Sequence, residues 1–409
     1  MNIEIFTIGD ELLIGQVIDT NSAWMSEKLS EAGFVINQIT SIKDKHDSIF
    51  AAIDDGFKRS DILLLTGGNG PTKDDITKNT LCSYFDDHLR MSDEVVENIE
   101  TLFRQKNLVL NELTRNQALV PQKSTVIQNK VGTAPILWFE ENGKVLVSMP
   151  GVPFEMRYAM NEEIIPRLTA AFETKTYLKR VFFTYNISES ALAIHLNDFE
   201  ENLPPAFELA YLPGGGVIRL RLSVKGEEHF EEMLKQAEKL KNELAKYLLI
   251  DSEGPLEQIV ATNLENKGLT ISIAESCSGG YLAHLFTSIP GSSHYFKGGV
   301  VSYADSAKKN ILKVSEANLA TYGAVSKQVV EDMAKGALSL FETNCSIAIS
   351  GIAGPDGGTD EKPVGTVWIC TMLNDSVITQ KYTFGNSREE NIRRSATMAM
   401  VQMLRMMIK

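Results

Sequence analysis

The strongest constraint on the fold is an alternation of short apolar runs with helical patterns, which occurs twice along the chain. In the first 170 residues, apolar runs such as IEIFTI (3–8) and DILLLTGG (61–68) alternate with helical patterns such as SAWMSEKLSEAG (22–33). The alternation returns from Leu256 onward. Strands that alternate with helices predict a parallel sheet with helices on both faces. We therefore expect two layered α/β domains.

The central part of the chain, from about residue 177 to residue 250, has a different pattern. Two strand-like segments join at Gly214–Gly216, and an amphipathic helix is expected over 227–249. The apolar residues of that helix recur at helical spacing, and its charged residues form a solvated face. We therefore predict a small α+β module. The expected domain boundaries are 1–170, 171–252 and 253–409.

The hairpin and long helix of this central module are similar to those of RNA-binding KH modules. Such modules hold the nucleic-acid backbone with a GxxG loop. No GxxG loop lies between two predicted helices here, and the long helix carries both acidic and basic residues. We therefore expect no RNA binding by this module.

The composition is typical of a soluble globular protein and narrows the choice of partners. The 409 residues carry a net charge of −13, with 43% hydrophobic and 23% charged residues. Nucleic-acid and membrane-surface proteins usually carry a basic patch, so neither partner is expected. None of the four cysteines belongs to a CxxC pair, which argues against a structural zinc site or disulfides. No apolar run approaches the roughly 18 residues that span a bilayer and no signal peptide is recognisable, so we expect a cytoplasmic protein.

A glycine-rich loop, TGGNGPTKDD at 66–75, directly follows a predicted strand. Glycines there can turn backbone N–H groups toward a phosphate, whereas adjacent aspartates repel one. Either Asp74 and Asp75 cap the next helix, or a divalent cation bridges them to the phosphate. We expect the cation, with further ligands from other strand ends, although Glu155 also fits a helix start. The expected metal ligands are Asp74, Asp75, Asp10, Asp44 and Glu155, with Glu11 close by, and the expected phosphate-binding residues are Gly67, Gly68, Gly70 and Thr72.

Three segments near the other end of the chain carry the residues of a second candidate site. They are AESCSGG (274–280), IPGSSHYFKGGVVSYADSAKK (289–309) and SGIAGPDGGTDEKPVG (350–365). A serine becomes nucleophilic when a neighbour takes its proton, and Lys308 or Tyr303 is suited to this if its pKa is lowered. Cys277 is a second candidate for the nucleophile. The alternative interpretation is that Cys277 is a small buried thiol. With Arg388 and the last glycine-rich loop to hold a phosphate, the pattern indicates acyl transfer on a nucleotide-sized anion.

These motifs resemble those of the CinA family, the competence/damage-inducible protein A proteins, over nearly the whole chain. GDELLIGQVIDTN, TGGNGPTKDD and SMPGVPFEM are similar to the molybdopterin-binding domain of molybdenum-cofactor synthesis proteins. AESCSGG, PGSSHYFKGGVVSYADSAKK, YGAVS and SGIAGPDGGTDEKPVGTVW resemble the CinA C-terminal domain. The resemblance implies a doubly wound, three-layer αβα N-terminal domain, a small α+β (KH-like) middle module and a C-terminal αβα amidase domain.

The resemblance also implies two hydrolytic activities. The C-terminal domain would be a nicotinamide-nucleotide amidase, which converts nicotinamide mononucleotide to nicotinic acid mononucleotide and ammonia without a cofactor. The N-terminal domain would be an ADP-ribose pyrophosphatase, which yields AMP and ribose 5-phosphate and needs a divalent metal ion such as Mg, Mn or Co. Both substrates are fragments of NAD, which implies a role in pyridine-nucleotide recycling, and we expect a homodimer. Two alternatives stay open: an N-terminal domain that binds a nucleotide or pterin without hydrolysis, and a competence or recombination adaptor with no chemistry of its own.

For the amidase we expect Ser293, in the turn PGSS, to be the nucleophile. Lys308 and Tyr303 would handle its proton, and Lys308 acts as the base only if its environment leaves it neutral. A charged Lys308 would instead hold Tyr303 or the developing oxyanion. Ser276 would orient the carboxamide. The residues expected to bind the rest of the substrate are Ser278, Gly279, Gly351, Gly354, Gly357, Gly358 and Arg388.

Overall fold

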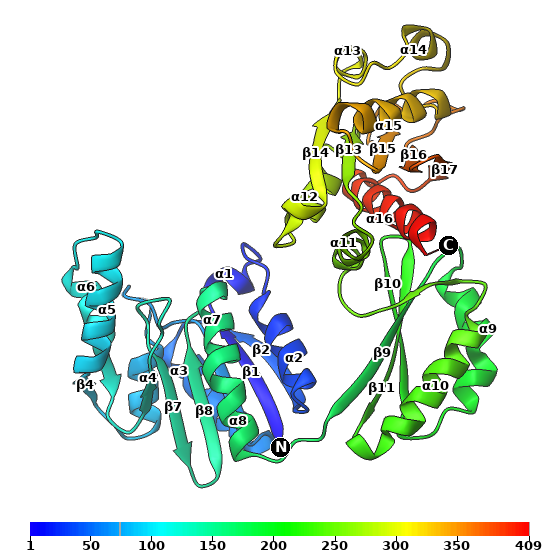
Figure 1. The fold of residues 1–409 in the computed structure, drawn as a ribbon. Coiled ribbons are helices and arrows are strands. Elements are labelled where there is room, and N and C mark those ends of the chain that lie inside the picture. Colours follow the sequence, from blue (N-terminus) through cyan, green and yellow to red (C-terminus); the bar gives the residue numbers. More distant parts are fainter. Residues whose placement is uncertain (73–74, 409) are drawn as a thin grey trace. The chain divides into compact units, whose positions relative to one another are not determined.

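The computed structural model describes residues 1–72 and 75–408 and divides into two compact units (Figure 1). The first unit comprises Met1–Leu178 together with the short segment Lys225–Phe230. The second comprises Lys179–Val224 and the chain from Glu231 onward.

The first unit is built on a six-stranded sheet of order β2-β1-β3-β8-β7-β6. Strands β1, β2, β3 and β8 are parallel, whereas β7 runs antiparallel to β8 and β6 antiparallel to β7. Its elements, in chain order, are β1 (Asn2–Ile8), α1 (Asp10–Leu13), α2 (Asn21–Glu31), β2 (Val35–Ile42), α3 (His46–Arg59), β3 (Ile62–Thr66), α4 (Thr77–Tyr84), β4 (Leu89–Met91), α5 (Asp93–Gln105), α6 (Glu112–Arg115), the 3-10 turn η1 (Asn116–Ala118), β5 (Leu119–Pro121), β6 (Thr125–Ile127), β7 (Ile136–Glu141), β8 (Lys144–Met149), α7 (Pro153–Ala159), the π-helical turn η2 (Met160–Ile164) and α8 (Ile165–Ala171).

Helices cover both faces of this sheet, as the alternating pattern predicts. Because successive side chains of a strand point to opposite faces, Ile62 and Leu64 of β3 pack toward one layer and Leu63 and Leu65 toward the other. The first layer contains α2, α7 and α8, and the second contains α3 and α4. The doubly wound three-layer αβα domain expected from the sequence is confirmed.

The sequence pattern missed two local features of this unit. The segment VPFEMRYAMNEEIIPRL (152–168) has the pattern of a single helix, but α7 and α8 are separated by the π-helical turn η2, close to Pro166. Proline removes a backbone donor and crowds the preceding turn, which favours such an irregularity. The second feature is a small two-stranded sheet, β4 with β5, which carries α5 and α6 outside the main sheet.

The second unit contains two sheets. One is four-stranded, of order β10-β11-β9-β12, and the other is five-stranded, of order β14-β13-β15-β16-β17. Its elements are β9 (Tyr177–Thr184), α9 (Glu189–Glu201), β10 (Glu208–Gly214), β11 (Val217–Lys225), the 3-10 turn η3 (Glu227–His229), α10 (Phe230–Glu243), β12 (Leu248–Asp251), α11 (Leu256–Asn266), β13 (Ile271–Glu275), α12 (Tyr281–Thr287), the 3-10 turn η4 (Ser292–His294), β14 (Phe296–Val301), α13 (Asp305–Asn310), α14 (Glu316–Tyr322), α15 (Lys327–Phe341), β15 (Cys345–Gly351), β16 (Thr366–Leu373), β17 (Ser376–Thr383) and α16 (Arg388–Met407).

The five-stranded sheet is also covered on both faces. One layer contains α11, α12 and α16, and the other is built around α15. The methionines of α16, among them Met400 and Met403, are buried in the first layer, where their flexible side chains fill the core. The same hydrophobic cluster includes Phe183 and Leu249 of the four-stranded sheet. The small α+β module and the C-terminal αβα domain therefore share a core.

Strand directions in both main sheets bring distant parts of the chain to one edge. In the first unit, the parallel strands β1, β2, β3 and β8 all end at the same edge of the sheet. In the second unit, β13, β14 and β15 are parallel and end together, and β17, antiparallel to β16, ends at that edge as well. In open α/β sheets, ligands bind at the carboxyl ends of the strands.

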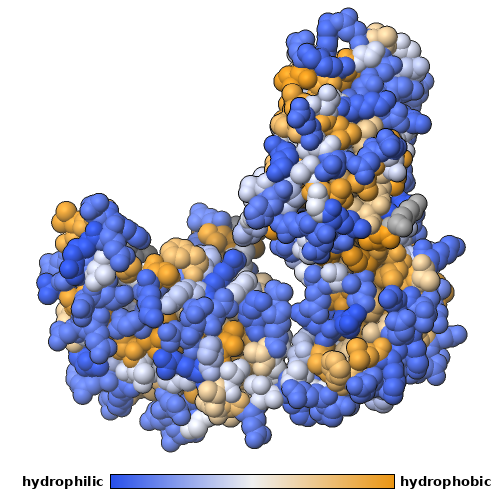
Figure 2. Space-filling model, in the orientation of Figure 1, coloured by the Kyte–Doolittle hydropathy of each residue, from blue (hydrophilic) through white to orange (hydrophobic). Residues whose placement is uncertain are grey.

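The visible surface is mostly hydrophilic, with scattered hydrophobic patches (Figure 2). None of the helices in the described part of the chain has the length and apolar content required to span a membrane.

We predict that the small α+β module does not bind single-stranded RNA. Its helices α9 and α10 are separated by the β10–β11 hairpin, so no short loop between two helices is present to hold a nucleotide backbone. Fluorescence anisotropy with a labelled 12-nucleotide RNA should show no binding at micromolar protein. Micromolar binding that weakens with salt, and that the substitution Arg219→Glu on β11 abolishes, would contradict this prediction.

Candidate functional sites

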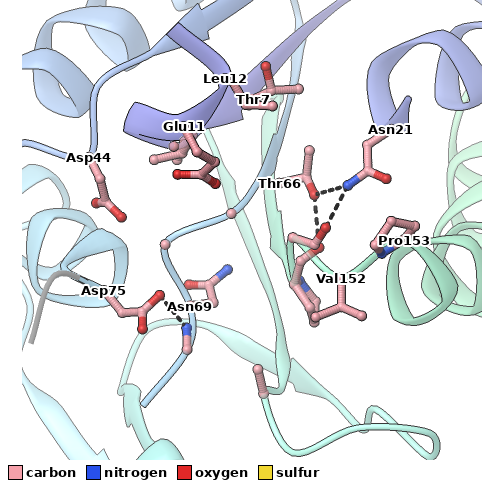
Figure 3. Close-up of a pocket in the computed structure, with 18 of the residues that line it drawn as sticks. Thr7, Glu11, Leu12, Asn21, Asp44, Thr66, Asn69, Asp75, Val152 and Pro153 are labelled. Carbon is pink, nitrogen blue, oxygen red and sulfur yellow. Dashed lines mark hydrogen bonds between the residues drawn. The ribbon is translucent and has the colours of Figure 1, made fainter. Parts of the chain in front are cut away.

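A cavity of about 480 Å³ lies at the carboxyl edge of the first sheet (Figure 3). It is lined by the loops that follow β1, β3 and β8, by Asp44 after β2, and by residues that precede β7. Its volume is within the range of small-molecule sites. The structure therefore brings the first predicted site together from several separate segments of the chain.

The glycine-rich loop after β3 forms the floor of this cavity. Gly67 and Gly68 have φ angles of 116° and 63°, which favour glycine. A Cβ on Gly67 would lie 2.2 Å from the carbonyl oxygen of Ile8, so a larger residue would displace β1. The Gly67 N–H donates to the Met149 carbonyl (3.2 Å), and the Gly70 N–H donates to Asp75 Oδ1 (2.7 Å). These two N–H groups of the loop are thus engaged within the protein.

Asp75 closes the loop on itself. Besides the bond from Gly70, its Oδ2 accepts hydrogen bonds from the Thr72 backbone N–H (2.9 Å) and the Thr72 hydroxyl (2.5 Å). Helix α4 begins only at Thr77, two residues after Asp75, so Asp75 does not occupy the cap position that the sequence suggested. Asp75 lines the cavity, and Asp74 lies outside the described residues.

Acidic side chains dominate the charge of the cavity. Six carboxylates line it, and the described part of its lining contains no Lys, Arg or His. In Figure 3, Glu11, Asp44 and Asp75 lie on one side of the glycine-rich loop, with Asn21, Val152 and Pro153 on the other. The described lining would therefore repel an anionic ligand. The six carboxylates are those of Asp10, Glu11, Asp19, Asp44, Asp75 and Glu155.

The described residues hold no group of three or more His, Cys, Asp or Glu residues arranged to bind a metal ion. Mg²⁺, however, is usually bound by one or two carboxylates together with substrate phosphates and water, rather than by a complete protein cage. The carboxylate of Asp44, which would lie 3.2 Å from a Cβ on Gly68, is next to the loop where a phosphate would sit. The donor set thus fits a hard divalent cation that arrives with its substrate.

Glu155 lines the same cavity but has a different environment. Its Oε2 accepts a hydrogen bond from Asn129 Nδ2 (2.7 Å), and a Cβ on Gly132 would lie within 2.0 Å of that oxygen. Burial raises the pKa of the Glu155 carboxyl, and the Asn129 bond opposes this effect. The structure therefore places Glu155 in the lining of the cavity. Glu155 also lies in the first turn of α7, so both interpretations of this residue from the sequence hold for its position.

Sequence reasoning missed the amide side chains of this site. The sequence pattern allows Asn21 or Ser22 as the cap of α2, but Asn21 Nδ2 donates to the Gly151 carbonyl (2.8 Å) and joins the loops after β1 and β8. The backbone N–H at the start of α2 is instead satisfied by Asp19, which accepts from Ser22 (3.0 Å). Asn69 Nδ2 likewise bonds the end of β8, through Ser148 Oγ and Met149 O. The sequence signal was present in the polar residues of both loops, but their partners could not be inferred.

The second candidate site lies at the carboxyl edge of the five-stranded sheet. Glu275, the last residue of β13, is buried, and its carboxylate accepts from the backbone N–H groups of Gly280 (3.1 Å), Leu282 (3.1 Å) and Ala283 (2.8 Å). This carboxylate therefore satisfies the first turn of α12 and fixes the turn of residues 276–280. The role of Glu275 was not anticipated from the sequence.

Ser276 begins that turn and is only 8% exposed. Its N–H donates to the carbonyl of Ile349 in β15 (2.9 Å). Its neighbour Cys277 is buried, and burial raises the pKa of the thiol to about 12, so it is protonated at neutral pH. The interpretation of Cys277 as a small buried thiol is confirmed. The hydroxyl of Ser278 is buried and has no hydrogen-bond partner among residues 1–72 and 75–408.

Lys308 of α13 is buried beside this turn, with an exposed fraction of 1%. Its Nζ donates to the carbonyls of Ser302 (2.9 Å) and Tyr303 (3.1 Å) and lies 3.6 Å from Asp305 Oδ1. Ser302 in turn donates its N–H to the carbonyl of Glu275 (2.7 Å), which links Lys308 to the residue before Ser276. Burial lowers the pKa of Lys308, and the charge of Asp305 opposes this shift.

Arg388, the first residue of α16, joins the remaining parts of the second site. Its Nη2 donates to the hydroxyl of Tyr303 (3.1 Å), and its Nη1 donates to the carbonyl of Gly354 (2.8 Å) in the loop after β15. Gly354 and Gly357 have φ angles near 90°, so glycine suits both positions, and the same loop carries Gly351 and Gly358. The structure thus brings together Ser276, Ser278, Gly279, Tyr303, Lys308, Arg388 and the loop after β15.

Ser293 is not brought into this group. It lies in η4, before β14 begins, whereas Tyr303 and Lys308 follow the other end of that strand. Six residues of strand, each rising roughly 3.3 Å, separate the two ends by on the order of 15 Å. The Ser293 carbonyl instead accepts a hydrogen bond from Lys297 (3.0 Å). Of the two candidate serines, Ser276 is the one at the same sheet edge as Lys308, since it follows Glu275, whose carbonyl accepts from Ser302, a partner of Lys308.

The protein therefore has two candidate sites, each at the edge of an αβα domain. The first is an acidic cavity lined by a glycine-rich loop, and the second is a cluster of serine, lysine and arginine side chains. Residues 4–170 match the probable molybdopterin-binding domain, residues 179–248 the damage-inducible protein CinA KH domain, and residues 253–408 the CinA C-terminal domain. These three matches follow the order of the domains along the chain.

Similarity to whole proteins is equally extensive. A CinA-like protein from Cytophaga hutchinsonii is 42% identical over 99% of this chain and 98% of its own length. A CinA-like protein from Flavobacterium psychrophilum is 39% identical over 100% and 99%. The solved structure of a competence/damage-inducible protein from Agrobacterium tumefaciens is 37% identical and covers 39% of this chain and 99% of its own, with a TM-score of 0.37. The chain belongs to the CinA family.

We predict that Glu275→Gln loosens the start of α12 without unfolding the sheet. A glutamine NH₂ would face backbone donors, and loss of such buried hydrogen bonds costs about 1–3 kcal/mol. Hydrogen exchange followed by mass spectrometry should show at least tenfold faster exchange of the amides of Gly280, Leu282 and Ala283. The amides of α15 and the variant Glu265→Gln, whose carboxylate lies beside His294, serve as controls. Unchanged exchange in α12 would show that the Glu275 carboxylate does not hold this turn.

Proposed function

We propose that the protein hydrolyses two fragments of NAD at separate sites. The C-terminal site would deamidate nicotinamide mononucleotide to nicotinic acid mononucleotide and ammonia. The N-terminal site would cleave ADP-ribose to AMP and ribose 5-phosphate with the help of a divalent metal ion. The observation that carries the proposal is the buried Lys308, with its lowered pKa, beside the turn that begins at Ser276.

In the proposed amidase reaction, Ser276 Oγ attacks the carboxamide carbon and its proton passes to neutral Lys308, directly or through Tyr303. The resulting tetrahedral intermediate collapses when the amine leaves as ammonia with that proton. An ester on Ser276 remains, and water hydrolyses it to the carboxylic acid. The backbone N–H groups of Cys277 and Ser278 are the candidate donors to the oxyanion, because those of Gly279, Gly280 and Tyr281 donate within the turn.

Two arguments favour Ser276 over the other candidate nucleophiles. Ser293, the nucleophile expected from the sequence, lies beyond the other end of β14 from Lys308. Cys277 carries a proton that burial makes hard to remove, and among the described residues no base contacts its sulfur through a hydrogen bond. The nucleotide phosphate is assigned to Arg388 and the loop after β15, because an Arg guanidinium pairs with phosphate through two N–H groups.

The N-terminal proposal rests on the charge of the cavity. A diphosphate could not approach six carboxylates without a cation, and the described lining supplies none. We assign the cation to Asp44 and Asp10, which lie near the glycine-rich loop, with Asp75 holding that loop closed. A bound divalent ion would neutralise the diphosphate and activate a water molecule. Gly67, Gly68, Gly70 and Thr72 would shape the floor on which the phosphates rest.

We predict that Ser276→Ala abolishes deamidation of nicotinamide mononucleotide in the full-length chain while leaving substrate binding within about threefold. Loss of a catalytic nucleophile removes turnover but few binding contacts. The variants Cys277→Ala and Ser293→Ala, matched in size, should keep most of the wild-type turnover. Ammonia release and calorimetric binding are the two measurements.

Retention of turnover by Ser276→Ala, with loss in either of the other two variants, would overturn the assignment of the nucleophile. Absence of turnover in the wild-type chain would instead overturn the proposed activity and favour the adaptor alternative.

We predict that ADP-ribose cleavage requires a divalent metal ion and that Asp44→Asn lowers kcat/KM at least tenfold. The substitution removes a negative charge beside the phosphate-binding loop, so more metal should be needed for half-maximal rate. Asp54→Asn on α3, where the carboxylate pairs with Lys58, is the matched control and should behave as wild type. Full cleavage in EDTA, or an unchanged metal dependence in Asp44→Asn, contradicts the proposal. Binding of ADP-ribose without cleavage would support the alternative of a binding domain.

A further inference from the structure

The ammonium nitrogen of Lys308 has three N–H bonds and three oxygen atoms near it, two from backbone carbonyls and one from a carboxylate. Two N–H bonds go to the carbonyls of Ser302 and Tyr303, which are fixed by the backbone at the end of β14. Asp305 Oδ1 lies 3.6 Å from the same nitrogen. A neutral amine keeps only two N–H bonds, which the two carbonyls can use, whereas the ammonium has a third N–H bond and a positive charge. Asp305 is therefore close enough to Nζ to favour the ammonium form over the amine.

The other elements around Lys308 contribute little negative charge. Cys277, on the loop after β13, is a protonated thiol at neutral pH. Tyr303, on the loop after β14, is tied to the cationic Arg388 at the start of α16. Among the groups that act on Lys308 in the described chain, Asp305 is thus the carboxylate that favours the ammonium form.

We propose that Asp305 is the counter-charge that decides when Lys308 gives up and takes back its proton. The inference rests on the proposed amidase, in which Lys308 is the base. Before attack, the ammonium must release a proton to water, and Asp305 opposes that release. After attack, the proton of Ser276 Oγ is on Lys308 Nζ, and Asp305 stabilises the charge so formed. Asp305 therefore raises the pH range in which the enzyme is active. Within that range it makes Lys308 a stronger base.

The size of the effect follows from the exposure of the pair. Lys308 is buried, but the Asp305 side chain is 66% exposed, so water and salt screen their attraction. An opposite charge within 4–6 Å shifts a pKa by about 1–3 units, and the lower end applies to this half-screened pair. Removal of the Asp305 charge should therefore move the acid limb of activity by about one pH unit.

The first test is the pH profile of kcat/KM for nicotinamide mononucleotide with the full-length protein. For Asp305→Asn we expect the acid limb to move about one unit lower, the rate on that limb to rise up to tenfold, and the plateau to fall. Asp305→Glu should restore the wild-type limb, and high salt should shift the wild type toward the Asn variant. Glu316→Gln removes a carboxylate that pairs with Lys309, and is the matched control. A profile of Asp305→Asn that matches the wild type, or a loss of rate at all pH values alike, would overturn the inference.

The second test does not depend on activity. Lysine labelled with ¹³C at Cε reports the titration of each amine by NMR, and Lys308→Met identifies the Lys308 signal. The Lys308 signal should titrate about one pH unit lower in Asp305→Asn than in the wild type and should not move in Glu316→Gln. Equal titration in wild type and Asp305→Asn would overturn the inference even in an active amidase. A shift in a protein without amidase activity would uphold the Asp305–Lys308 coupling and reject the proposed function.

Discussion

Both candidate sites depend on the common direction of the strands in each parallel sheet. Backbone register sets Thr66 level with Met149 in the first sheet, and Glu275 level with both Val301 and Ile349 in the second. The loops that follow these strands therefore start at the same height and meet above the sheet edge. Residues separated by more than 80 positions in the chain come into hydrogen-bond contact in this way, as in the bonds from Thr66 to Pro150 and from Arg388 to Tyr303.

The two edges differ in the charges that they present, and this difference underlies the proposed division of chemistry. The described lining of the first cavity has carboxylates and no cationic side chain, which is why a cation is proposed there for an anionic nucleotide. The second edge carries Arg388, held by the Gly354 carbonyl, which can balance the charge of an anion. The buried carboxylate of Glu275 is satisfied by backbone N–H groups rather than by a cation. These charges support the proposal of a metal-dependent pyrophosphatase site in the first unit and a metal-free amidase site in the second.

The layered fold could be predicted from the sequence because the periodic burial pattern is local. The side chains of β3 alternate between two cores as its sequence suggests, and the α16 methionines fill the core. The sites were predicted only in part, because contacts between loops are not local. Ser293, Tyr303 and Lys308 are close in sequence, yet the whole of β14 separates the first from the other two. Asn21 and Glu275 were not recognised, since the partners of each are set by the turns of the folded chain.

The proposed amidase reaction requires that Ser276 becomes acylated at the edge of the second sheet. This can be tested by stopping turnover of nicotinamide mononucleotide with acid and mapping the modified peptide by mass spectrometry. We expect the mass of a nicotinate mononucleotide ester on the peptide that contains Ser276, and no such mass in Ser276→Ala. The same added mass on Ser293 or on Cys277 would show that Ser276 is not the nucleophile.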